Sequence, residues 1–85
     1  MVYSIQIHHA ARKQILALCR QVRVAIAREI DQLVQNTRPE GCKKLKGTEL
    51  WRIRSGRYRV VYAIDDNNRI IIILKIALRR EDMYK

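Results

Sequence analysis

The chain opens with strict alternation of apolar and polar residues. Tyr3, Ile5 and Ile7 share one parity, and the polar Ser4 and Gln6 share the other. A period of two residues is the pattern of a half-buried β-strand. The chain is therefore expected to begin with a strand over residues 2–8.

From Ala10 onward the apolar spacing becomes helical. The first helical stripe contains Ala11, Ile15, Leu18 and Cys19. The second contains Val22, Ile26, Ile30, Leu33 and Val34. Arg20-Gln21 is the expected turn between two helices, although one bent helix also fits the pattern. Pro39 ends the helical region, because proline disfavours helix in the residue before it.

The second half of the chain predicts three consecutive strands. Their expected ranges are Leu50–Arg54, Arg57–Ile64 and Ile70–Ala77, with turns at Ser55-Gly56 and Asp65–Asn68. The last strand is apolar on both parities, which predicts a central strand covered on both sides. The element order is then β-α-α-β-β-β, an α+β fold with a mainly antiparallel four-stranded sheet.

The first hairpin separates apolar from cationic residues. With Ser55-Gly56 as a two-residue loop, Arg54 opposes Arg57 and Arg52 opposes Arg59, and directly opposed residues share a face. The other face carries Trp51, Ile53, Tyr58, Val60, Tyr62 and Ile64. Both helices are expected to pack on that apolar face. The same register places Lys75 opposite Arg59 on the arginine face.

Opposed like charges on neighbouring strands destabilise a sheet by a few tenths up to about 1 kcal/mol per pair. Eighteen Lys and Arg against eight Asp and Glu give a formal net charge of +10. Such a surface is explained if a polyanion normally occupies it, with a solvated basic face as the simpler alternative. Lys43, Lys44 and Lys46 lead into the first arginine-bearing strand and extend this surface, or form a solvated loop.

Other chemistry has little support in the sequence. Cys19 and Cys42 lack metal-ligand spacing, which favours reduced thiols, and His8 and His9 are interpreted as strand-end residues. No cofactor or metal is expected. The chain has no apolar run long enough for a transmembrane helix and no signal-peptide pattern, so we expect a single cytoplasmic domain over residues 1–85 without membrane contact.

Clustered arginines suit one reaction, the transfer of an RNA phosphodiester from a 5′-oxygen to the neighbouring 2′-hydroxyl. Arginines stabilise the charge that develops on the phosphorane. Arginine is a poor base because its pKa stays above about 12. Tyr84 follows Arg79 and Arg80 and could act as the base if nearby cations lower its pKa; packing is an equal alternative for this residue.

The run KLKGTELWRIRSGRYRVVYAIDD, the apolar strand after it and the ending RREDMY resemble the RelE/ParE toxins of bacterial toxin–antitoxin modules. The resemblance extends over the whole chain. It implies a microbial-RNase-like fold without the usual His/Glu pair. It also implies a RelE-like toxin that cuts mRNA in the ribosomal A site, inhibits translation and is silenced by a cognate acidic antitoxin.

The resemblance assigns catalytic roles by position in this chain. Arg59 matches the arginine of the YR-x-V-Y strand, Arg79 the arginine after the last strand, and Tyr84 the terminal tyrosine. Arg52 and Arg54 stand where RelE toxins often have lysine, which places more weight on Tyr84 as the base. The residues expected to bind RNA are Lys43, Lys44, Lys46, Arg57, Lys75 and Arg80. A ParE-like inhibitor of DNA gyrase and a non-catalytic RNA-binding module are the alternatives.

Overall fold

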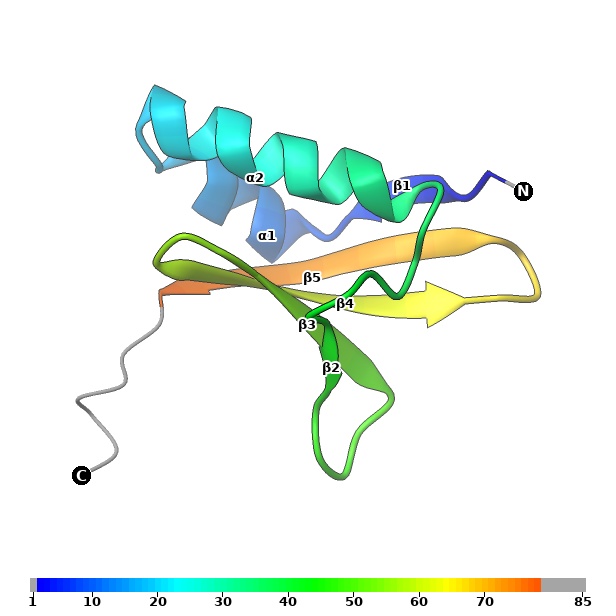
Figure 1. Ribbon diagram of the computed structural model, residues 1–85. Helices are drawn as coiled ribbons and strands as arrows, with labels where there is room; N and C mark the ends of the chain where they lie inside the picture. The colour runs from blue at the N-terminus through cyan, green and yellow to red at the C-terminus, as the bar shows by residue number, and fades with distance from the viewer. Residues whose placement is uncertain (1, 79–85) are drawn as a thin grey trace.

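A computed structural model describes residues 2–78 as one layer of helices on one layer of sheet (Figure 1). The elements are β1 (Ser4–Ile7), α1 (His9–Leu16), α2 (Arg20–Leu33), β2 (Lys43–Lys44), β3 (Leu50–Ser55), β4 (Tyr58–Asp65) and β5 (Ile70–Leu78). The predicted α+β class is confirmed. The sheet has one strand more than predicted, because the short β2 lies in what was expected to be a loop.

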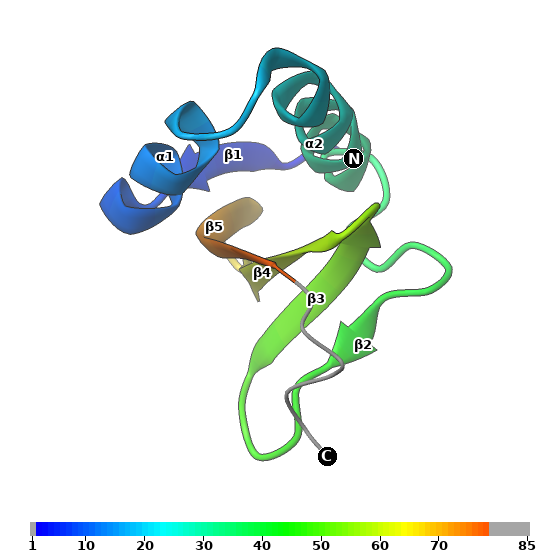
Figure 2. The same cartoon turned by 90° about the vertical axis from the view of Figure 1, so that its left-hand side faces the viewer.

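The sheet has the strand order β1-β5-β4-β3-β2. β1 runs parallel to β5, and the other neighbouring strands are antiparallel. The apolar β5 is central, as predicted, but within residues 2–78 the helices cover only one of its faces. Figure 2 shows α1 and α2 on the same side of the sheet, with β3 and β2 curling away from them.

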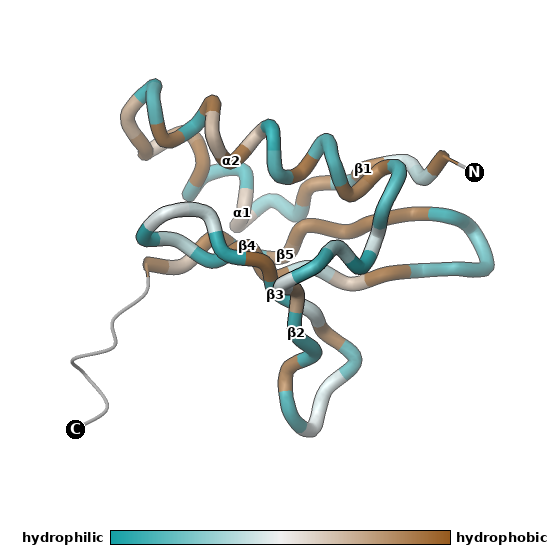
Figure 3. Tube along the Cα trace, in the orientation of Figure 1, coloured by the Kyte–Doolittle hydropathy of each residue, from teal (hydrophilic) through white to brown (hydrophobic). Residues whose placement is uncertain are grey.

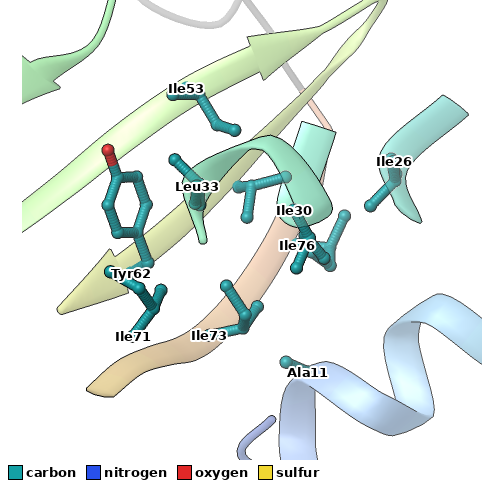
Figure 4. Close-up of a cluster of buried hydrophobic side chains, with 10 residues drawn as sticks. Ala11, Ile26, Ile30, Leu33, Ile53, Tyr62, Ile71, Ile73 and Ile76 are labelled. Carbon is teal, nitrogen blue, oxygen red and sulfur yellow. The ribbon is translucent and has the colours of Figure 1, made fainter. Parts of the chain in front are cut away.

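The core lies between the helices and the face of the sheet that they cover. Ile26, Ile30 and Leu33 of α2 are buried, as is Ala11 of α1 (Figure 4). Their partners in the sheet are Ile53, Val60, Tyr62, Ile71, Ile73 and Ile76. Figure 3 shows the apolar residues of α2 recurring between polar ones along the helix. The predicted packing of the helices on the apolar face of the hairpin is confirmed.

The two helices are separate, but the break lies earlier than predicted. α1 ends at Leu16 and α2 begins at Arg20, so Cys19 is the N-cap of α2 and is exposed instead of lying on a helical stripe. His8 is the N-cap of α1, and its Nδ1 accepts a hydrogen bond from the Ala10 N–H at 3.1 Å. A side chain that accepts from the first turn satisfies a backbone donor that the helix itself leaves unpaired.

The first hairpin is displaced by one residue from the predicted turn. Ser55 pairs with Tyr58, so the two-residue loop is Gly56-Arg57 instead of Ser55-Gly56. Gly56 has φ 59°, which a glycine adopts without steric cost at the first central position of a type II′ turn. Moving the loop by one residue shifts the strand pairing by two. Each side chain therefore stays on its predicted face while its partner across the strands changes.

A β-bulge interrupts the pairing of β4 with β5. Val61 pairs with Lys75 and Tyr62 with Ile73, which leaves Leu74 as the extra residue. Lys75 is therefore opposite Val61, and the predicted pairing of Lys75 with Arg59 is wrong. The bulge also brings Ile71, Ile73 and Ile76 onto the core face, although a regular strand would place Ile76 on the other side.

Candidate nucleic-acid interface

The face of the sheet opposite the helices carries a cluster of cations, which we call the cation face: Lys43, Arg52, Arg54, Arg59 and Lys75. Its residues form two rows across the strands. One row runs Lys43, Arg52, Val61, Lys75. The next row runs Arg54, Arg59, Ala77. Four strands thus contribute to one surface, as the alternation in the sequence predicts for the arginines.

The arginines of the cation face differ in burial. Arg54 is exposed, Arg59 is half-buried and Arg52 is only 7% exposed. The Nε of Arg59 is buried and has no hydrogen-bond partner. The sequence predicted an open arginine face, and this is wrong for Arg52. Arg59 therefore carries a desolvated donor, which an incoming oxyanion could satisfy.

Neither of the two predicted pairs of opposed arginines exists, because the register is shifted, and one different pair forms instead. Arg54 lies directly opposite Arg59, whereas Arg52 lies opposite Val61 and Arg57 sits in the turn. Within residues 2–78, Arg54, Arg59 and Lys75 make no ion pair, whereas Arg38 pairs with Asp66 and Lys44 with Glu49. No ion pair of Arg54 or Arg59 in this part of the chain therefore offsets the repulsion between them.

The other predicted RNA-binding residues lie around the cation face. Lys44 pairs with Trp51 across the strands and so points to the opposite face, where its Nζ lies 3.5 Å from Glu49. Lys46 and Arg57 are exposed in the loops at the two ends of β3. Arg79, Arg80 and Tyr84 lie outside the described residues, so their predicted roles stay predictions.

A second polar cluster, which sequence reasoning missed, fastens the connection between α2 and β2. Asp66 accepts hydrogen bonds from the Tyr3 hydroxyl at 2.5 Å and from the Arg38 guanidinium at 3.1 Å. That guanidinium also stacks over Trp51, 5.1 Å from the ring centroid. These residues are far apart in the sequence, so no local spacing could have predicted the cluster.

Two pKa shifts follow from these contacts. The Tyr3 hydroxyl, followed by Arg38, holds the pKa of Asp66 below its usual value, because both donors favour the carboxylate. The same hydrogen bond raises the pKa of Tyr3. Nearby, the buried Tyr62 donates to the Thr37 carbonyl at 2.8 Å, and burial raises the pKa of Tyr62. The connection is thereby held against the sheet by Arg38 at Asp66 and by the Thr37 carbonyl at Tyr62.

Within residues 2–78 no three His, Cys, Asp or Glu side chains gather closely enough to hold a metal ion. Both cysteines are free thiols, Cys19 exposed and Cys42 half-buried. No helix in the described part of the chain is long and apolar enough to cross a membrane.

The described residues form a small α+β domain with one cationic sheet face, and comparison with known proteins identifies the family. Residues 5–83 match the family model described as ParE toxin of type II toxin–antitoxin system, parDE. A relative from Methanocaldococcus jannaschii, described as a candidate toxin RelE1, is 36% identical over 89 residues that cover 100% of this chain and 98% of the relative. The chain belongs to the RelE/ParE toxins of type II toxin–antitoxin systems.

Solved structures agree with this assignment. A chain in the crystal structure of the archaeal RelE–RelB complex from Pyrococcus horikoshii OT3 has a TM-score of 0.85 at 30% identity, covering 95% of this chain and 99% of that chain. A chain of the intact Escherichia coli RelBE toxin–antitoxin complex has a TM-score of 0.80 at 23% identity, covering 93% and 99%. The second likeness shows the shared fold. The predicted RelE-like resemblance is confirmed.

Proposed function

We propose that this toxin is a ribosome-dependent endoribonuclease that cuts mRNA in the ribosomal A site and so inhibits translation in the cytoplasm. One observation carries the proposal: Arg54 and Arg59 are directly opposed on the cation face, and the Arg59 Nε is buried without a partner. Opposed cations with an unsatisfied donor are unfavourable in the free protein. An RNA phosphate between them would satisfy the donor and screen the repulsion.

The proposed reaction is an internal transesterification. The 2′-oxygen loses its proton and forms a bond to the adjacent phosphorus, and the bond to the 5′-oxygen breaks as that oxygen takes up a proton. The products are a 2′,3′-cyclic phosphate and a free 5′-hydroxyl. Arg59, with Arg54 beside it, stabilises the negative charge on the phosphorane, and Arg52 and Arg79 support the same phosphate. Tyr84 accepts the proton in this proposal.

The remaining cations of the site bind the RNA on both sides of the cut. Lys43 and Lys75 stand at the two ends of the row that contains Arg52, so they reach phosphates away from the reacting one. Lys46 and Arg57 are exposed beyond the ends of β3 and extend the path. These contacts position the chain without reading its sequence.

The proposed inhibitor is an acidic antitoxin. The formal net charge of +10 favours binding of an anionic partner when no RNA is bound. The relative from Pyrococcus horikoshii, at 30% identity, is described as a RelE–RelB complex, which supports the same kind of partner for this chain. A segment that orders as it binds could cover the cation face.

A second candidate function is inhibition of DNA gyrase without RNA cleavage. The observation that favours it is the description of the matching family model, which is that of a ParE toxin. Both functions share the fold, so the cation face alone does not separate them. They differ in whether a phosphodiester of mRNA is broken.

The test adds purified toxin to ribosomes stalled on a defined mRNA and maps new 3′ ends by primer extension. The proposal predicts cuts within the A-site codon that disappear when ribosomes are omitted. A parallel assay measures supercoiling by gyrase at the same toxin concentration. Loss of supercoiling without any ribosome-dependent cut would establish the second candidate and overturn the first.

A further inference from the structure

A cavity of mixed charge adjoins the cation face at the edge formed by β2 and β3. Its volume is about 390 Å³, within the range of about 300–1,000 Å³ that is usual for small-ligand sites. Arg54 and Lys43 line it from the sheet, and Glu29 and Gln32 line it from α2. Glu40, in the connection between α2 and β2, adds a second carboxylate. The cavity therefore joins cations of the proposed RNA site to a wall that carries two carboxylates and an amide.

The two carboxylates determine which part of an RNA suits the cavity. Within residues 2–78, neither Glu29 nor Glu40 forms an ion pair. Two uncompensated negative charges repel a phosphate, so the RNA backbone is expected to stay on the cation face. A carboxylate accepts hydrogen bonds, and the exocyclic amino groups of nucleobases donate them. A base, and not a phosphate, is therefore the part of an RNA that fits the chemistry of the cavity.

The lining of the cavity also offers apolar surface to the flat face of a base. Ile53, which is 4% exposed, and the half-buried Pro39 both line it. Glu29 is half-buried and belongs to the 14-residue helix α2, whereas Glu40 is exposed in the connection. A side chain on a helix is positioned more precisely than one on a loop. Glu29 is therefore the better placed of the two carboxylates to read the edge of a base.

Arg54 connects the cavity to the proposed reaction site. It lines the cavity, and it lies directly opposite Arg59 on the neighbouring strand β4. A phosphate held between these two arginines would therefore lie close to the nucleotide whose base enters the cavity. The phosphate fixes the position of the RNA, and the cavity examines its sequence.

We propose that the cavity binds an unpaired RNA base that carries an exocyclic amino group, and that this group donates a hydrogen bond to the Glu29 carboxylate. The inference rests on the proposed function, because it assigns a base-binding subsite to the same RNA site. Uracil is the RNA base without an exocyclic amino group, and its O4 would place an acceptor against the carboxylate. Glu29 is thereby a specificity-determining residue, and the toxin disfavours uracil at this subsite.

The test measures the binding of two uncleavable RNAs to the full-length protein at low salt by fluorescence anisotropy. The RNAs are 2′-O-methyl oligomers of cytidine and of uridine, equal in length and charge. Cytosine and uracil have nearly the same shape, but cytosine carries the N4 amino group where uracil carries O4. The inference predicts that wild type binds the cytidine oligomer about tenfold more tightly than the uridine oligomer.

Glu29→Gln separates base recognition from general attraction to RNA. The amide is close in size to the carboxylate, and it can accept from cytosine or donate to uracil, so the ratio of the two affinities should fall toward one. Glu49→Gln removes the same charge from an exposed carboxylate outside the cavity and should keep the wild-type ratio. Both variants lose one negative charge, so comparison of the ratios cancels any general gain in RNA affinity.

The outcomes decide the inference separately from the nuclease proposal. Equal affinities of wild type for the two RNAs, a preference for uridine, or the same cytidine preference in wild type and Glu29→Gln would overturn the base-binding subsite and leave a site for phosphates alone. Failure of both RNAs to bind would also overturn it. Neither measurement depends on cleavage, so the ribosome assay tests the nuclease proposal independently.

Discussion

Arg54 and Arg59 face each other on adjacent strands, and neither forms an ion pair within residues 2–78. Arg54 is exposed and Arg59 half-buried, so the charge of Arg54 can be removed with little loss of packing. Arg54→Gln should therefore leave the free energy of unfolding unchanged or raise it by up to about 1 kcal/mol. It should also weaken RNA binding and reduce the slope of log affinity against log salt concentration by about 0.7–0.9. Urea denaturation and a salt series of RNA titrations measure the two effects.

Substitution of Arg52 should lower the free energy of unfolding, unlike substitution of Arg54, although Arg52 is the neighbouring residue of β3 on the same face. Arg52 is 7% exposed, so most of its side chain is packed against neighbouring residues. Arg52→Ala should lower the free energy of unfolding by about 1–3 kcal/mol. Arg54→Gln serves as the matched control in the same urea titration. Equal stability of the two variants would show that the burial of Arg52 contributes nothing to the fold.

Gln14 completes the hydrogen bonding of β5 where β1 has ended. Its Oε1 accepts from the Ile76 N–H at 2.7 Å, while β1 pairs with β5 only at Ile70–Ile73. Gln14→Leu should cost about 1–3 kcal/mol of unfolding free energy, because the partly buried Ile76 N–H loses its acceptor. Gln14→Glu keeps an acceptor oxygen and should lose less. Thermal unfolding of the three proteins ranks them, and a Leu variant as stable as wild type would contradict the assigned role.

Asp66 should make the fold sensitive to acid. Its pKa is lowered in the folded state by Tyr3 and then Arg38. A lowered carboxyl pKa contributes stability that is present above the ordinary value of about 3.9 and is lost as the pH falls through the folded-state pKa. Asp66→Asn should therefore flatten the decline of the melting temperature below about pH 4, and Tyr3→Phe should flatten it in part. Parallel curves for wild type and Asp66→Asn would show that Asp66 has the same pKa in both states.

The sequence predicted the faces of the sheet better than its register. Alternation assigns each residue of β3 and β4 to a face, and a shift of two residues does not change that assignment. The register depended on which residue takes positive φ, and Gly56 occupies the first loop position instead of the second. The bulge at Leu74 could not be predicted from the local sequence. In a strand with apolar residues on both faces, the hydrophobic pattern is the same with and without a one-residue shift.

The candidate site was predicted in composition but not in burial. The cations of the face follow from parity, yet the burial of Arg52 and the buried Nε of Arg59 depend on how the curled sheet packs. The break after α1 was placed too late because Leu18 and Cys19 continue the apolar spacing beyond the helix. Leu18 packs against the core although it lies beyond the end of α1. The apolar spacing therefore predicted its burial correctly and its helical conformation wrongly.

The most direct test of the account is the single-turnover rate at which ribosome-bound mRNA is cleaved by wild type, Arg59→Gln and Arg28→Gln. Arg28 is an exposed cation of α2, on the helical side of the molecule, and controls for loss of one positive charge. The account predicts that saturating Arg59→Gln cleaves about 10²–10³-fold more slowly than wild type, while Arg28→Gln cleaves at nearly the wild-type rate. Equal rates for wild type and Arg59→Gln, or no ribosome-dependent cleavage by wild type, would contradict the claim that the cation face is a catalytic RNA site.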